Sequence, residues 1–160
     1  MNRIAPWLIS GVIMFVCTYS ARADDMVSYA TGGYASGLRT KGMMHKIDAN
    51  HDGMISREEW IAFQDKVFAM LDKNKDGKVD ETEYLRANPQ LVSFATGGYA
   101  RGLQTHDMFK KIDADGDGVI SRDEFVNYQL KIFDMMDTSS VHKGMLGAGE
   151  FFATGGKPAR

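Results

Sequence analysis

The sequence predicts an all-α fold built from helix–loop–helix repeats, and three observations support this prediction. Three twelve-residue segments each place oxygen-bearing side chains at fixed intervals around a glycine. Much of the chain repeats itself after a constant interval. Apolar residues between the oxygen-rich segments recur at helical spacing. A length of 160 residues, 44% of them hydrophobic, is enough for one modest domain with a core.

The first residues have the pattern of an export signal. Arg3 supplies a positive charge, residues 4–19 are mostly apolar, and Ala21-Arg22-Ala23 forms a cleavage site. The apolar run contains Pro6 and is shorter than the roughly 20 residues that a spanning helix needs. We therefore expect a signal peptide at 1–23, cleavage after Ala23, and a periplasmic or secreted protein without stable membrane insertion.

The mature chain would be acidic and free of cysteine. Cys17 is the only cysteine and lies within the expected signal, so no disulfide could stabilise the exported protein. Removing residues 1–23 deletes Arg3 and Arg22 from the 19 basic residues and none of the 21 acidic ones, which leaves 17 against 21. This balance disfavours nucleic acid as a partner.

The rest of the chain is a tandem duplication. A shift of 65 positions aligns residues 26–71 with 91–136, and 26 of the 46 aligned pairs are identical. We assign residues 24–90 to a first pair of loops, 48–59 and 72–83, and residues 91–160 to a second pair, 113–124 and 137–150. Asn88-Pro89-Gln90 should end the helix that leaves the second loop.

Three of the loops have the composition of a site for a large, hard cation. Loops 1 (48–59), 2 (72–83) and 3 (113–124) carry oxygen-bearing side chains at positions 1, 3, 5, 9 and 12. The glycine that the sharp turn requires stands at position 6 of each, as Gly53, Gly77 and Gly118. Calcium takes six to eight oxygen ligands, which such a segment can supply by wrapping around the ion.

These loops resemble those of EF-hand calcium-binding proteins of the calmodulin-like superfamily. The resemblance implies that position 7 contributes its backbone carbonyl and that position 12 closes the site with both carboxylate oxygens. It therefore predicts about three Ca²⁺ ions as the cofactor, with these ligands: Asp48, Asn50, Asp52, Met54, Ser56 and Glu59; Asp72, Asn74, Asp76, Lys78, Asp80 and Glu83; Asp113, Asp115, Asp117, Val119, Ser121 and Glu124.

Loop 4 has lost most of this pattern. Asp137 and Glu150 match the first and last ligand positions, but the segment between them makes the loop fourteen residues long. Ser139, Val141, His142 and Lys143 replace the expected acids, while Gly144 and Leu146 keep the turn and the inward apolar residue. We expect a structural role for loop 4 without a tight calcium site, and a weak site is the alternative.

The spacing of the loops predicts how the helices are shared. Only twelve residues separate Glu59 from Asp72, so residues 57–71 should form one helix, roughly 22 Å long, that leaves loop 1 and enters loop 2. Helical spacing puts Trp60, Phe63, Val67 and Leu71 on one face, and the second half repeats this with Phe125, Tyr128, Ile132 and Met136. Antiparallel packing of the two long helices would pair loop 1 with loop 4 and loop 2 with loop 3.

Two short helices are expected ahead of loops 1 and 3, at 40–47 and 105–112. They offer Met43, Met44, Met108 and Phe109 as further core residues. The short spacing also resembles secreted bacterial EF-hand proteins and, in spacing alone, the lanthanide-binding lanmodulins. Lanmodulin-like loops carry proline at position 2, where this chain has Ala49, Lys73 and Ala114, so lanthanide binding is the weaker hypothesis.

Two functions are compatible with the sequence. The chain is either a calcium sensor or calcium-stabilised binding module, or an interaction protein whose fold calcium merely maintains. Methionine side chains line partner grooves in some calcium sensors, but they also fill ordinary cores. An enzyme is not expected, because the sequence lacks nucleophile and zinc-protease motifs and its acids are used as metal ligands.

Overall fold

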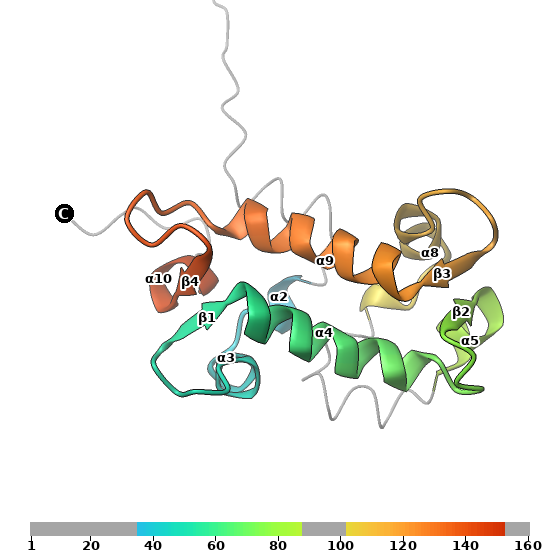
Figure 1. Ribbon diagram of the computed structural model, residues 1–160, viewed down its shortest axis with the longest axis horizontal. Helices are drawn as coiled ribbons and strands as arrows, with labels where there is room; N and C mark the ends of the chain where they lie inside the picture. Colours follow the sequence, from blue (N-terminus) through green and yellow to red (C-terminus); the bar gives the residue numbers. More distant parts are fainter. Residues whose placement is uncertain (1–34, 88–101, 153–160) are drawn as a thin grey trace, which may run out of the picture.

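Two fifteen-residue helices form the centre of the molecule. The computed structural model describes residues 35–87 and 102–152. The expected signal peptide at 1–23 and the seam at Asn88-Pro89-Gln90 lie outside these residues. Helices α4 (Arg57–Leu71) and α9 (Arg122–Met136) lie side by side and run antiparallel (Figure 1). The predicted bounds of the first long helix are confirmed.

Short elements follow at both ends of the long helices. Ahead of loop 1 lie α2 (Ala35–Leu38) and α3 (Lys41–Ile47), and loop 1 ends in strand β1 (Met54–Ser56). Loop 2 ends in β2 (Lys78–Asp80), which leads into α5 (Glu81–Arg86). The second half repeats this order with α8 (His106–Ile112), β3 (Val119–Ser121), β4 (Met145–Gly147) and α10 (Ala148–Phe151).

The loops pair across the two halves of the sequence. Strand β1 pairs antiparallel with β4, with Ile55 opposite Leu146, and β2 pairs antiparallel with β3, with Val79 opposite Ile120. All four of these side chains are fully buried. The predicted pairing of loop 1 with loop 4 and of loop 2 with loop 3 is therefore confirmed. The two loops of each half lie at opposite ends of their shared helix and do not pair with each other.

Two aromatic contacts join α4 and α9 in the core. The rings of Trp60 and Phe133 lie 5.7 Å apart between centroids, and those of Phe68 and Phe125 lie 5.8 Å apart. The indole Nε1 of Trp60 donates a hydrogen bond to the backbone carbonyl of Gln129 at 3.0 Å, so the buried indole keeps a partner for its polar group. Of the expected apolar stripe on α9, only Tyr128 remains partly exposed.

The short helices close the core at its sides. Met43, Met44, Met108 and Phe109 are buried as predicted. Thr40 and Thr105 cap their helices by accepting hydrogen bonds from the backbone N–H of Met43 and Met108, each at 3.2 Å. Among the described residues, no helix combines the length and the apolar content that crossing a membrane requires.

Candidate metal centres

The first residue of each complete loop is held by the glycine of the turn. One carboxylate oxygen of Asp48 accepts a hydrogen bond from the backbone N–H of Gly53 at 3.0 Å, and Asp72 makes the same bond with Gly77 at 3.0 Å. Asp113 accepts from Gly118 at 3.1 Å. Each glycine has a φ between +83° and +86°, a backbone conformation that favours glycine over other residues. The turn therefore fixes the position of the first carboxylate.

The second oxygen of this carboxylate is buried without a partner in loops 1 and 2, and the first carboxylate of loop 4, Asp137, shares this feature. Asp48 is only 4% exposed and Asp72 8% exposed, and the Oδ1 atom of each has no hydrogen-bond partner in the described structure. A buried carboxylate oxygen without a partner is unfavourable, because it has lost its hydration. A cation bound inside the loop would compensate this loss. The residues present thus fit a hard cation.

The ligands at positions 3 and 5 are ordered by short-range hydrogen bonds that recur in every complete loop. The position-3 side chain accepts from the backbone N–H of position 5, at 2.9 Å in loop 1, 2.8 Å in loop 2 and 3.0 Å in loop 3. The position-5 carboxylate accepts from the N–H of position 7, at 2.8, 2.9 and 2.9 Å. The position-7 residues Met54, Lys78 and Val119 begin strands β1, β2 and β3.

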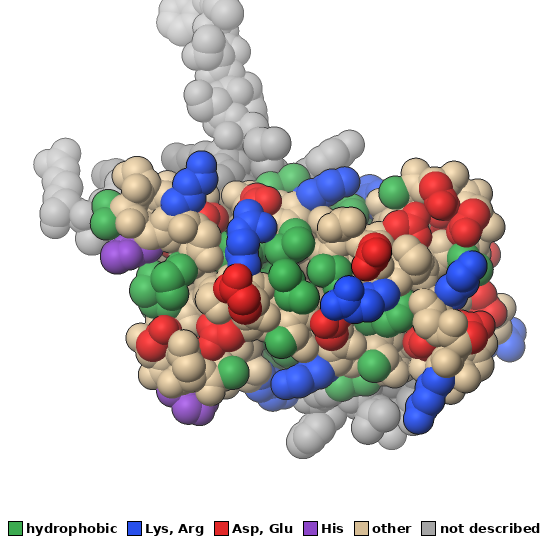
Figure 2. Space-filling model, viewed as in Figure 1, with side chains coloured by type: hydrophobic (Ala, Val, Ile, Leu, Met, Phe, Trp, Pro, Cys, Tyr) green, Lys and Arg blue, Asp and Glu red, His purple; other side chains and the backbone are tan. Residues whose placement is uncertain are grey.

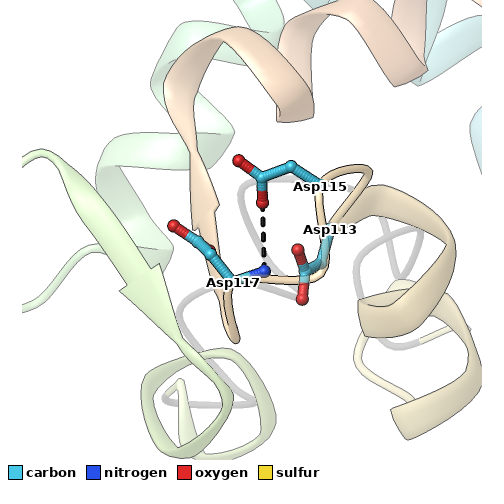
Figure 3. Close-up of side chains that lie close together, drawn as sticks. All are labelled: Asp113, Asp115 and Asp117. Carbon is cyan, nitrogen blue, oxygen red and sulfur yellow. Dashed lines mark hydrogen bonds between the residues drawn. The ribbon is translucent and has the colours of Figure 1, made fainter.

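Loop 3 carries the highest concentration of negative charge. The carboxylates of Asp113, Asp115 and Asp117 offer oxygens that all lie within 4.8 Å of one another (Figure 3). In loop 1 the amide of Asn50 donates to Asp52 at 3.0 Å, and in loop 2 Asn74 donates to Asp76 at 2.9 Å. Asp115 stands in place of these amides, and its side chain has no N–H to donate, so carboxylate repulsion in loop 3 depends on a cation for relief.

The terminal glutamate closes each loop and also caps the following helix. Glu59 accepts from the backbone N–H of Ala49 at 2.9 Å with one oxygen and from that of Ser56 at 2.9 Å with the other. Ser56 in turn accepts from the N–H of Glu59, which completes a capping box at the start of α4. Asp80 with Glu83 and Ser121 with Glu124 repeat this arrangement. Positions 9 and 12 are thus fixed by the helix itself.

Hydrogen bonding lowers the pKa of two of these glutamates, Glu59 and Glu124, and so favours their charged form. Burial alone would raise the pKa of Glu59, but hydrogen bonds from the backbone of Ser56 and Asn50 and from the Ser56 hydroxyl outweigh it, and the pKa is lowered. The pKa of Glu124 is lowered in the same way, burial being outweighed by hydrogen bonds from the backbone and hydroxyl of Ser121. Both groups are ready to bind a cation as carboxylates.

Loop 4 keeps the frame of the other loops but lacks their acids. Asp137 accepts from the N–H of Gly144 at 2.6 Å, and Glu150 accepts from Thr138 at 3.0 Å and from Gly147 at 3.2 Å. Between these ends, the hydroxyl of Ser139 accepts from the N–H groups of Val141 and His142. The first and last residues are placed as in loops 1–3, with no carboxylate between them. Strand β4 of loop 4 pairs with strand β1 of loop 1 and so helps to hold loop 1 in place.

Every residue predicted as a ligand lies in its expected loop position, and the ligand roles themselves stay predictions. Three features were not predicted from the sequence: the capping boxes, the contact between His45 and His51, and a cavity of about 620 Å³ beside loop 4. The cavity is lined by Arg57, Asp134, Asp137, Lys143 and Gly144. The serine or aspartate at position 9 with glutamate three residues later was the signal that could have revealed the capping boxes.

Comparison with known families finds EF-hand sequences in this chain. The family model of an EF-hand domain pair matches residues 62–130, and that of an EF hand matches residues 41–64. Mouse calcium-binding protein 4 is 36% identical over 70 residues, covering 44% of this chain and 22% of that protein. Calmodulin-like protein 5 of Arabidopsis thaliana is 38% identical over 69 residues, covering 43% and 30%.

An enzyme also contains a similar segment. The probable chloroplastic GTP diphosphokinase CRSH of Arabidopsis thaliana is 30% identical over 86 residues, which cover 52% of this chain but only 14% of that protein. The chain spans less than a third of the length of these three relatives. No solved structure matches the chain.

We predict that Asp115→Asn will stabilise the metal-free protein and weaken calcium binding at loop 3. The new amide can donate to Asp117, as its counterparts do in loops 1 and 2, and one charge leaves the carboxylate cluster. We expect the unfolding free energy in chelator to rise by about 1 kcal/mol, measured by urea denaturation. Asn50→Asp is the matched control and should have the opposite effect in loop 1. A metal-free Asp115→Asn protein that is less stable than the parent would show that carboxylate repulsion does not govern loop 3.

Proposed function

Because the chain belongs to the EF-hand calcium-binding proteins, we propose that it is an exported, calcium-stabilised binding module that takes up about three Ca²⁺ ions through loops 1–3. The observation that carries this proposal is the set of buried, unpartnered oxygens on Asp48 and Asp72, together with the three crowded carboxylates of loop 3. Calcium would neutralise these groups and so favour the folded state over the unfolded one.

Export is part of the proposal and rests on the leader-like residues 1–23. In a compartment outside the cytoplasm, calcium is plentiful, and EF-hand modules there need dissociation constants of only about 10⁻⁴ to 10⁻³ M. A cysteine-free acidic chain would then depend on calcium where other exported proteins depend on disulfides. N-terminal sequencing of the exported protein tests this, and a first residue other than Asp24 would oppose cleavage after Ala23.

A calcium sensor is the second candidate for the same sites. In such a protein, calcium would separate helices and expose methionine side chains to a partner. Met43, Met108 and Met136 are at most 3% exposed in this structure, so a sensor role requires the core to open. Circular dichroism with calcium and with chelator separates the two: a folded metal-free chain that changes shape favours the sensor, and an unfolded one favours calcium-dependent stability.

We propose no catalytic role. The acids that the described structure gathers lie in the calcium loops, where their oxygens are committed to the backbone and the expected metal. The match to a GTP diphosphokinase covers only 14% of that enzyme, so it gives this chain no catalytic role. The net negative charge likewise disfavours nucleic acid as a partner.

Loop pairing also divides the calcium sites into two classes. Loops 2 and 3, both complete, share the β2–β3 ladder, whereas loop 1 shares the β1–β4 ladder with the degenerate loop 4. Ordering one strand of a ladder helps to order its partner, so an ion in loop 3 should favour binding in loop 2. Loop 1 has no metal-binding partner to which it could couple in this way.

We predict that calcium will raise the melting temperature of the protein markedly. Each site adds about 2.7 kcal/mol of stability when free calcium is about 100-fold above its dissociation constant. Thermal unfolding followed by circular dichroism in calcium and in chelator measures the effect. The triple variant Glu59→Gln, Glu83→Gln and Glu124→Gln is the control and should not respond. An unchanged melting temperature of the parent protein would overturn the proposed stabilisation.

We predict that Glu124→Gln will abolish the binding of one Ca²⁺ ion and lower the affinity for a second. The substitution removes a ligand of loop 3, and the loss of order in β3 should lower the affinity of loop 2 through the shared ladder. Calorimetric titration should show two ions, one of them bound as in the parent.

The matched control for this prediction is Glu150→Gln, which changes the corresponding residue of loop 4. It should leave about three ions bound, because loop 4 lacks the intervening carboxylates. Undiminished stoichiometry in Glu124→Gln, or the loss of an ion in Glu150→Gln, would contradict the assignment.

A further inference from the structure

Two histidines that are six residues apart in the sequence meet at the surface beside loop 1. The ring centroids of His45 and His51 lie 6.5 Å apart, with their planes inclined at 64°. His45 is in the last turn of α3, and His51 occupies position 4 of loop 1. Both side chains are exposed. In Figure 2, histidine side chains are seen at the end of the molecule formed by loops 1 and 4.

Hydrogen bonds on either side of these rings hold the backbone that carries them. Asp48 caps the C-terminus of helix α3: its backbone N–H donates to the carbonyl of Met44 at 2.8 Å, and its carboxylate accepts from the N–H of Gly53 at 3.0 Å. Between these bonds, His51 adopts a φ of +60°, which turns the chain back toward α3. Histidine is among the few residues that enter this left-handed region with some frequency. The contact therefore follows from the loop frame.

We propose that His45 and His51 form a binding site for a divalent transition-metal ion, separate from the calcium site of loop 1. A metal bound to imidazole lies about 2.0 to 2.1 Å from the nitrogen, which places it about 3 Å from the ring centroid. Two rings that share one ion thus have centroids up to about 6 Å apart. The observed 6.5 Å is close to this limit, and exposed side chains can make the small rotation that closes the gap.

The chemistry of the ligands separates this site from the calcium loops. Imidazole nitrogen favours Zn²⁺, Ni²⁺ and Cu²⁺, whereas calcium is bound through oxygen. The described residues bring no third histidine or carboxylate into one group with this pair, so water would complete the coordination. Such a site should bind Cu²⁺ more tightly than Ni²⁺ or Zn²⁺, following the usual order of affinity of these ions.

The chain has four histidines in all, and the two outside this pair provide matched controls. His142 is exposed in loop 4, and its ring has no partner ring among the described contacts. His106 lies at the start of α8, with its Nδ1 beside a carboxylate oxygen of Glu81. Neither meets a second imidazole in the described structure, so neither should contribute to the proposed site.

The test uses the untagged full chain saturated with calcium, so that the oxygen-rich loops are already filled, and titrates it with Ni²⁺ by calorimetry. The variant His45→Gln keeps a residue of good helix propensity in α3. The variant His51→Asn keeps a residue that tolerates the left-handed backbone of loop 1. We expect one Ni²⁺ per parent chain and a loss of affinity of about tenfold or more in each variant. His106→Gln and His142→Gln should bind Ni²⁺ as the parent does.

A second readout identifies the ligands directly. The electron paramagnetic resonance spectrum of the Cu²⁺-loaded parent should show coupling to two imidazole nitrogens, and that of His51→Asn to no more than one. Calcium stoichiometry measured on the same samples verifies that loop 1 is intact. Equal Ni²⁺ affinity in the parent, His45→Gln and His51→Asn, or a loss of affinity in His142→Gln, would overturn the proposal whether or not the calcium assignment holds.

Discussion

The packing of α4 against α9 is the interaction on which the rest of the structure depends. Each helix serves two loops, so its position places a loop at each end. The contact is mainly apolar, and the rings of Trp60 and Phe133 and of Phe68 and Phe125 interlock across it. Ion pairs join Arg57 to Asp134 and Arg122 to Asp65 near the two ends of the helices. They are largely exposed and contribute little energy compared with the buried rings.

The metal loops and the helices share residues, which links calcium binding to the fold. Glu59 closes loop 1 and also belongs to the capping box that begins α4. The short strands within the loops, in turn, bury Ile55, Val79, Ile120 and Leu146. A loop can therefore lose its acids and keep its structural role, as loop 4 does through β4. In Figure 2, acidic side chains gather at the end of the molecule formed by loops 2 and 3.

Much of this arrangement could be predicted because loop spacing constrains it. The interval between Glu59 and Asp72 leaves room for a single helix only, and the duplication then fixes which loops meet. Side-chain details of the site were less predictable. The burial of the Asp48 carboxylate and the meeting of His45 with His51 depend on left-handed turns and on how the loop packs, which residue spacing alone does not reveal. Helical periodicity likewise put Tyr128 in the core, whereas it lies at the edge of the apolar face and stays partly exposed.

The most direct test of loop pairing across the two halves is a nuclear Overhauser spectrum of the calcium-loaded protein, which reports which loop strands are neighbours. Antiparallel pairing predicts backbone proton contacts between the strands of Ile55 and Leu146 and between those of Val79 and Ile120. Contacts between the strands of Ile55 and Val79, or of Ile55 and Ile120, would contradict it. In that case, the antiparallel packing of the long helices and the division of the calcium sites into two classes would both be wrong.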